Sequence, residues 1–265
     1  MNLRDRLFPP RPDLPAEVTS IDVMKTVALV LMVIDHVGWL LFPQIEWFRV
    51  LGRLCIPLWF FLIGYARARD VPTRWLVAGI IMMVSNILVG LPALPLAVLF
   101  TMALTRVAID PFWRFVAAKP YYFWWSVLLL MFAAYATGLV VEYGTIGFLL
   151  ACCGYAVRNR EEVDTALEGV ARTPSQALMI AVFIGFGILE AMSFGFSMLA
   201  FAVLLAGLTG VYFVLQTFET KTLPGVGNAN LFQFFGRYTL EIYVIHLLVL
   251  KAVFGLQVLA IYLIG

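Results

Sequence analysis

The chain has 265 residues, of which 63% are hydrophobic and 13% charged, with a formal net charge of +2. Soluble domains carry about 25% charged residues, so this composition and the mean hydropathy of +0.95 exclude a cytosolic enzyme, a disordered chain and a disulfide-stapled secreted domain. The small net charge also argues against nucleic acid as a partner. We expect an all-α, polytopic integral membrane protein whose surroundings are the lipid bilayer.

Residues 1–20 are polar, charged and proline-rich, and we interpret them as a cytoplasmic lead-in. They have neither the apolar core nor the cleavage site of a signal peptide. We expect residues 21–265 to form a single transmembrane domain, because they contain no internal repeat and no low-complexity tract.

About nine apolar runs, with a range of eight to ten, approach the length needed to cross a bilayer in one bundle. Pro92 and Pro95 separate the third run from the fourth, and the last is long enough to break near Phe254 and Gly255. The runs are Ile21–Phe42, Trp47–Tyr65, Trp75–Leu91, Ala93–Ile109, Tyr122–Val141, Tyr143–Val157, Ser175–Ser193, Phe196–Phe218 and Leu231–Leu263.

Arginine and lysine residues alternate between the gaps that separate these runs. They gather before the first run and after each even-numbered run, whereas the other gaps hold almost none, with Arg49 as the exception. Because cytoplasmic loops carry the excess of positive residues, this pattern predicts a cytoplasmic N-terminus.

The apolar runs contain more ionisable residues than a passive bundle needs. Each costs several kcal/mol at bilayer depth unless it is paired or hydrated, so such residues indicate a functional site, although some of them pair only to fix helix register. They are Asp35, His36, Arg53, Glu142, Glu190, Glu241, His246 and Lys251, with Lys25 and Arg237 nearer the cytoplasmic side. The three cysteines, Cys55, Cys152 and Cys153, show no metal-ligand spacing, and we interpret them as buried small hydrophobes.

The first run places a histidine on a polar stripe. Lys25 and His36 are eleven residues apart and lie within ~20° of each other on a helix. Asp35 diverges from His36 by ~100°, so a carboxylate from another helix, such as Glu142, is an equal candidate for orienting this histidine. Glu142 has a second interpretation as a helix cap, because Gly144 follows it.

The second run combines a buried cation with a helix breaker. Pro57 predicts a kink or break, and Arg53 before it is either an ion-pair partner or a donor aimed into a cavity. Arg67, Arg69 and Arg74 follow this run. They are either a topology signal or a site for the phosphates of a coenzyme A thioester.

Three stretches of the sequence resemble a known family. DVMKTVALVLMVIDHVGWLL, FRVLGRLCIPLWFFLIGYARAR and EYGTIGFLL closely resemble the TraX family. FGRYTLEIYVIHLLVL is similar to the closing helix of the wider membrane acyltransferase superfamily.

The resemblance implies acetyl transfer from acetyl-coenzyme A, as co-substrate, to the N-terminal amine of a pilin-like subunit in the bacterial inner membrane. The residues that match the family pattern are Asp35, His36, Arg53, Glu142 and His246, which we assign to catalysis. Lys25, Arg67, Arg69 and Arg74 are assigned to the coenzyme A thioester, and no metal site is expected.

Histidine has the unperturbed pKa, near 6.5, that suits a general base. We expect His36 either to deprotonate the acceptor or to carry an acyl intermediate, with Arg53 or a tyrosine stabilising the oxyanion. The alternatives are O-acetylation of an envelope glycan or lipid, cyclisation of a pilin through an amide, a small proton-coupled transporter, and a scaffold subunit of a secretion system.

Overall fold

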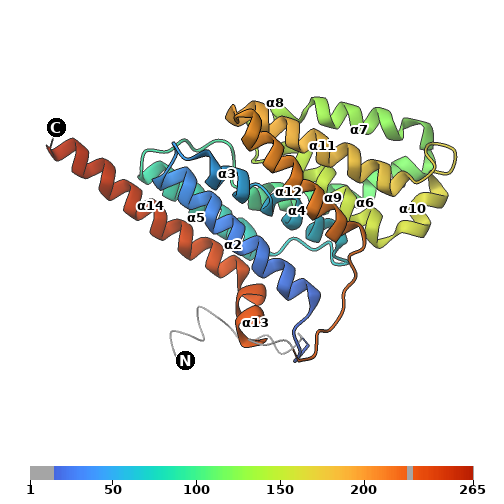
Figure 1. The fold of residues 1–265 in the computed structure, drawn as a ribbon, viewed down its shortest axis with the longest axis horizontal. Helices are drawn as coiled ribbons and strands as arrows, with labels where there is room; N and C mark the ends of the chain where they lie inside the picture. Colours follow the sequence, from blue (N-terminus) through green and yellow to red (C-terminus); the bar gives the residue numbers. More distant parts are fainter. Residues whose placement is uncertain (1–14, 226–228, 265) are drawn as a thin grey trace. The chain divides into compact units, whose positions relative to one another are not determined.

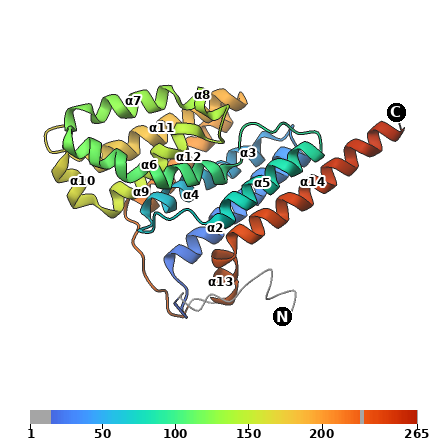
Figure 2. The same cartoon turned by 180° about the vertical axis from the view of Figure 1, so that it is seen from behind.

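The computed structural model describes residues 15–225 and 229–264, which form helices joined by short turns and loops. No strand occurs in these ranges beyond two isolated bridges, so the prediction of an all-α protein is confirmed. The chain divides into two compact units, one of which is Ile56–Phe218 (Figures 1 and 2). The other joins the segment ending at Cys55 to the segment that begins at Glu219. Our expectation of a single domain stays a prediction.

The unit that joins the two ends of the chain is built around α2. A reciprocal pair of bonds between Thr19 and Asp22 caps the start of this helix. α14 runs alongside α2, and α3 and α13 pack against it as well (Figure 1). The bounds are α2 Ser20–Leu41, α3 Glu46–Gly52, α13 Ala229–Arg237 and α14 Thr239–Ile264.

The other unit is centred on α9, most of whose side chains are buried. Helices α6, α7, α8, α11 and α12 pack around it (Figure 2). The bounds are α4 Cys55–Tyr65, α5 Thr73–Leu88, α6 Val98–Ala118, η1 Pro120–Tyr122, α7 Phe123–Phe132, α8 Ala134–Gly138, α9 Gly144–Arg158, α10 Arg160–Ala166, α11 Pro174–Phe194 and α12 Met198–Gln216.

Two glycines allow α4 and α9 to approach backbone to backbone. A Cβ atom at Gly64 would lie 1.7 Å from the carbonyl oxygen of Ala151, and one at Gly154 would lie 2.0 Å from that of Phe61. Small residues permit this close packing between helices in a membrane, where van der Waals contact replaces the hydrophobic effect.

Among the described residues, five helices are long and apolar enough to cross a membrane, or six if α6 and the segment after it form one span bent by 119°. These are Ser20–Leu41, Glu46–Tyr65, Pro174–Phe194, Met198–Gln216 and Thr239–Ala260. The protein is therefore a helical membrane protein, but the count of nine spans is not confirmed, because the third and sixth runs form helices of only 16 and 15 residues. The cytoplasmic N-terminus stays a prediction.

Of the two helix breaks predicted within the apolar runs, the structure contains one and lacks the other. The second run breaks at Arg53 and Leu54, just before Pro57 in the first turn of α4, as the missing N–H of proline leads one to expect. The predicted break near Phe254 and Gly255 is wrong, because α14 continues through both residues and the chain breaks instead at Tyr238. A glycine keeps its backbone hydrogen bonds in a helix, and these are costly to lose in an apolar surrounding.

Candidate active site

The two histidines of the chain lie against each other. Nδ1 of His36 on α2 is 2.9 Å from Nε2 of His246 on α14, although the residues are 210 positions apart. Their rings stack with centroids 5.1 Å apart at an interplanar angle of 27°. The residue that hydrogen-bonds to His36 and orients it is therefore a second histidine, and not Asp35 or Glu142.

The hydrogen bonds fix where the protons lie when both rings are neutral. Nδ1 of His246 is 2.8 Å from the carbonyl oxygen of Ile242, which can only accept, so this nitrogen carries the proton. Nε2 of His246 is then an acceptor, and Nδ1 of His36 must donate to it. Nε2 of His36 is left with its lone pair, which is the state that a general base requires.

Asp35, next to His36 in the chain, holds two arginines instead of the histidine. Nη1 of Arg49 is 2.8 Å from Oδ2 of Asp35, and Nε of Arg53 is 3.6 Å from Oδ1. All three side chains are at least 88% buried. Of the two interpretations of Arg53, the structure places it in an ion pair.

Gly52 makes this cluster possible. A Cβ atom at Gly52 would lie 2.3 Å from Cβ of Asp35 and 2.6 Å from its Oδ1. The absence of a side chain lets α3 lie directly on α2, so that Arg49 and Arg53 each pair with one oxygen of the Asp35 carboxylate. Gly52 and Arg53 thus act together: the glycine permits the close helix contact, and the arginine pairs with the carboxylate at that contact.

Two further polar side chains from α14 are buried in this unit. Tyr243 is 7% exposed, and its ring centroid lies 6.2 Å from that of His36 and 6.0 Å from that of His246. Lys251 is 3% exposed. Tyrosine is the second side-chain type that we expected to stabilise an oxyanion, and the structure brings one beside the histidine pair.

Glu142 belongs to the other unit, where it caps a helix. Its Oε2 accepts a hydrogen bond of 2.8 Å from the backbone N–H of Val98 at the start of α6, and its carbonyl oxygen accepts one of 2.6 Å from Thr101. A carboxylate at a helix N-terminus is favourable because it satisfies a free N–H and the helix dipole. The capping interpretation is the one that this geometry supports, although the capped helix is α6 and not α9.

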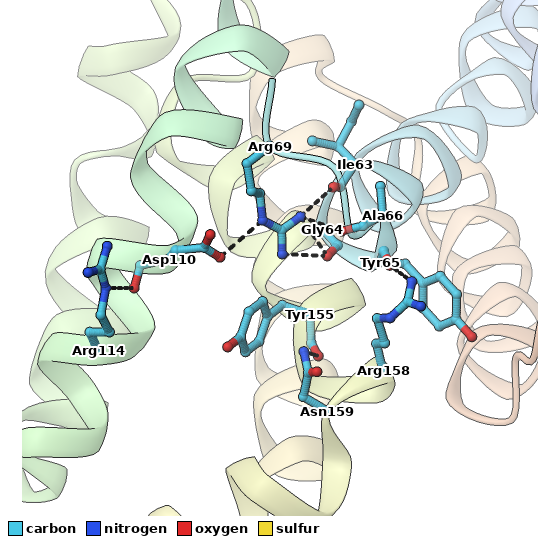
Figure 3. Close-up of polar contacts among 10 residues, drawn as sticks. All are labelled: Ile63, Gly64, Tyr65, Ala66, Arg69, Asp110, Arg114, Tyr155, Arg158 and Asn159. Atoms are coloured by element: carbon cyan, nitrogen blue, oxygen red, sulfur yellow. Dashed lines mark hydrogen bonds and ion pairs between the residues drawn. The ribbon is translucent and has the colours of Figure 1, made fainter. Parts of the chain in front are cut away.

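Arg69 is engaged with protein groups at the end of α4 (Figure 3). Its Nε donates to Oδ1 of Asp110 at 3.0 Å, and Nη1 donates to the carbonyl oxygen of Ala66 at 2.5 Å. Longer contacts of 3.4 and 3.5 Å join Nη1 and Nη2 to the carbonyl oxygen of Gly64. All three guanidinium nitrogens of Arg69 thus bond to protein, which stabilises the C-terminal carbonyls of α4.

The other residues assigned to coenzyme A lie at or near the surface of their units. Arg67 and Arg74 are exposed, and Lys25 is half-buried on α2. Arg158 from α9 adds a second arginine at the end of α4, donating to the carbonyl oxygen of Tyr65 at 2.5 Å (Figure 3).

Arg49 is the residue of the site that sequence reasoning missed. In the sequence it stands out only as an exception to the distribution of positive charge. Its spacing of four residues from Arg53 is the signal that could have found it, because residues four apart share one helix face. Within the described residues, no group of three or more metal-ligating side chains occurs.

The fold and the half-buried His36–His246 pair define the class: a helical membrane protein with a polar centre among its apolar helices. The chain belongs to the TraX family, since the family profile described as TraX protein matches residues 20–254.

Two curated relatives match the chain over about half of its length. Protein TraX of Escherichia coli is 29% identical over 155 residues, which is 53% of this chain and 57% of the relative. An uncharacterised protein of Rickettsia prowazekii, RP591, is 24% identical over 140 residues, 53% of this chain and 56% of the relative. The chain thus matches little more than half the length of these curated relatives. No solved structure matches it.

Proposed function

We propose that this protein is a membrane-embedded acyltransferase that moves an acetyl group from acetyl-coenzyme A to an acceptor amine, with His36 as general base. The observation that carries the proposal is the hydrogen bond between His36 and His246, which leaves Nε2 of His36 unprotonated. The resemblance to the TraX family supplies the substrates: the donor thioester and, as acceptor, the N-terminal amine of a pilin-like subunit in the bacterial inner membrane.

The chemistry needs one proton to be taken up and returned. The neutral acceptor amine attacks the thioester carbonyl, a C–N bond forms, and Nε2 of His36 removes a proton from the nitrogen. The tetrahedral intermediate then expels the coenzyme A sulfur, which receives that proton from Nε2. The products are an amide and the free thiol, and His36 returns to its neutral state.

His246 serves as a positioning residue in this scheme. Its Nε2 accepts from Nδ1–H of His36 and so holds the ring and its tautomer in place. When His36 takes up the proton, this acceptor stabilises the imidazolium. Asp35, Arg49 and Arg53 fix α3 against α2 next to the base, and Tyr243 is the proposed donor to the oxyanion.

The hydrogen-bond order favours a base over a proton conduit. The chain of bonds ends at the carbonyl oxygen of Ile242, which cannot take up a proton at neutral pH. A proton taken up at His36 can therefore pass to Nε2 of His246 but no further along this chain of bonds. This supports acyl transfer over the proton-coupled transporter.

The test uses purified protein, isotopically labelled acetyl-coenzyme A and a panel of acceptors, with products read by mass spectrometry. The acceptors are a pilin-like peptide with a free N-terminal amine, the same peptide with a blocked amine, and a hydroxyl-bearing glycan or lipid. Label on the free amine alone is the expected result. Label on the hydroxyl acceptor would contradict the assignment of an amine acceptor. Proton-dependent uptake of a solute without any acetyl transfer would contradict the proposal that the protein is an enzyme.

A further inference from the structure

A cavity of about 80 Å³ lies between the C-terminal parts of α6 and α9 and the short helix α10. Trp113, Arg114, Tyr155, Glu162 and Val163 are among the residues that line it. All of them belong to the unit Ile56–Phe218, and nothing in the proposed acyl transfer uses them.

One residue that lines the cavity, Trp113, has a buried hydrogen-bond donor without an acceptor among the described residues. Trp113 is 5% exposed and stacks on Tyr155 with ring centroids 5.0 Å apart at 13°. Across the part of the chain that the structure describes, no atom accepts a hydrogen bond from its Nε1. A buried donor in this state costs about 1–3 kcal/mol, which a ligand bearing an acceptor atom would recover.

The rim of the cavity carries one charge of each sign. Arg114 and Glu162 are both exposed there, and within the described ranges no ion pair joins them. A contact of 3.4 Å from Nε of Arg114 to the carbonyl oxygen of Asp110 leaves the terminal nitrogens of its guanidinium group for a ligand (Figure 3). A purely anionic ligand would meet Glu162, and a purely cationic one would meet Arg114, so the two charges together fit a zwitterion.

The size of the cavity and its position on the helices restrict the kinds of ligand that can bind there. A cavity of 80 Å³ is smaller than the roughly 150 Å³ that admits a benzene ring, so it can enclose one small polar group while the rest of the ligand lies at the rim between Arg114 and Glu162. Trp113 lies near the end of α6, and exposed aromatic side chains follow it at Tyr121 and Trp125. Tryptophan and tyrosine gather at the level of the lipid headgroups.

We propose that this cavity binds the zwitterionic headgroup of a phospholipid that carries a phosphate and a primary ammonium, as in phosphatidylethanolamine. A phosphate oxygen accepts from Nε1–H of Trp113 and from the guanidinium of Arg114. The ammonium donates to the carboxylate of Glu162. The acyl chains remain in the bilayer outside the cavity.

The experiment measures lipid binding to the full chain by native mass spectrometry from detergent. The probes are phosphatidylethanolamine, phosphatidylcholine and phosphatidylglycerol with identical acyl chains, and soluble phosphoethanolamine. The variants are Trp113→Phe, which keeps the stacked ring but removes the N–H, and Glu162→Gln. Their matched controls are Trp125→Phe, at an exposed tryptophan, and Glu161→Gln, on the same helix but outside the cavity.

The wild-type chain should prefer phosphatidylethanolamine over the other two lipids. Trp113→Phe should weaken this binding by about tenfold, the effect of one hydrogen bond to a charged group. Glu162→Gln should abolish the preference over phosphatidylglycerol.

Equal binding by Trp113→Phe, Glu162→Gln and the two controls would overturn the proposal, provided that all four unfold at the wild-type temperature. So would equal retention of all three lipids, or binding of soluble phosphoethanolamine in preference to the lipid. None of these readouts depends on acyl transfer, so failure of the proposed function leaves the test intact.

Discussion

Nη1 of Arg49 lies 2.8 Å from Oδ2 of Asp35, and this ion pair explains the one arginine that departs from the predicted charge distribution. Arg49 sits on the short helix α3, which packs on α2, and its side chain is 12% exposed. A cation that is neutralised inside the protein does not act as a topology signal. The exception in the sequence pattern therefore marked a buried contact.

Replacing Asp35 should lower the melting temperature of the protein more than replacing an exposed charged residue does. Asp35→Asn keeps the size of the side chain but removes the charge opposite two buried guanidinium groups. Breaking a buried pair from one side costs about 3–5 kcal/mol, because the remaining charge stays desolvated. The measurement is the apparent melting temperature of purified protein in detergent.

The pair between Glu219 and Lys221 supplies the control for Asp35. Its atoms are 2.8 Å apart, but the side chains are 67% and 66% exposed, so Glu219→Gln should leave the melting temperature unchanged. Adding Arg49→Met to Asp35→Asn should cost less than Arg49→Met alone. Additive losses would mean that the two side chains do not interact in the folded protein.

The histidine pair predicts unequal effects of substitution on acyl transfer. His36→Ala should lower kcat by roughly 10²–10⁴-fold, the usual contribution of a general base. His246→Ala should lower kcat less and leave the donor KM unchanged, because it removes only the acceptor that positions His36. His246→Gln, whose side-chain oxygen can accept from Nδ1–H, should recover part of the loss.

The rescue by glutamine separates positioning from a merely structural role. If His246→Ala and His246→Gln lose equal activity while both remain folded, the hydrogen bond to His36 is not what His246 contributes. Full activity in His36→Ala would remove both the general-base and the acyl-histidine mechanisms.

The sequence predicted which ionisable residues lie at the candidate site better than it predicted which residues they contact. The rule that ionisable residues are expensive in apolar helices singled out Asp35, His36, Arg53 and His246, which lie in one unit. It also singled out Glu142, which lies in the other unit and caps a helix there. The helical nature of the segments followed from their apolar length. Neither inference requires knowledge of how distant segments pack.

The partners could not be predicted, because they depend on that packing. His36 and His246 are 210 residues apart, and no local spacing connects them. Arg69 was expected at a ligand, but its nitrogens meet the carbonyls that end α4 and Asp110 on α6. The count of nine spans is not confirmed, because several apolar runs form short or bent helices, which hydropathy alone does not distinguish from full spans.

Arg69 should therefore contribute to stability. Arg69→Gln removes the donors that hold the end of α4 and should cost about 1 kcal/mol, in line with hydrogen bonds that are partly exposed. Arg67→Gln, at an exposed arginine two positions away, should leave the melting temperature unchanged. If Arg67 and Arg74 bind the phosphates of coenzyme A, their replacement should instead raise the KM for acetyl-coenzyme A by roughly tenfold per contact. A higher KM for acetyl-coenzyme A in Arg69→Gln, with no loss of stability, would show that Arg69 binds the donor.

The close crossing of α4 and α9 gives the last prediction. Gly154→Ala would place a methyl group 2.0 Å from the carbonyl oxygen of Phe61, so the helices must separate. Overpacking of this kind costs about 1–3 kcal/mol and sometimes more, because the atom that is hit belongs to the backbone and cannot rotate away. Gly210→Ala, on α12 with nothing within 4 Å of the added atom, is the matched control and should be neutral or slightly stabilising. Equal melting temperatures for the two variants in detergent would show that α4 and α9 do not touch at Gly154 in the folded protein.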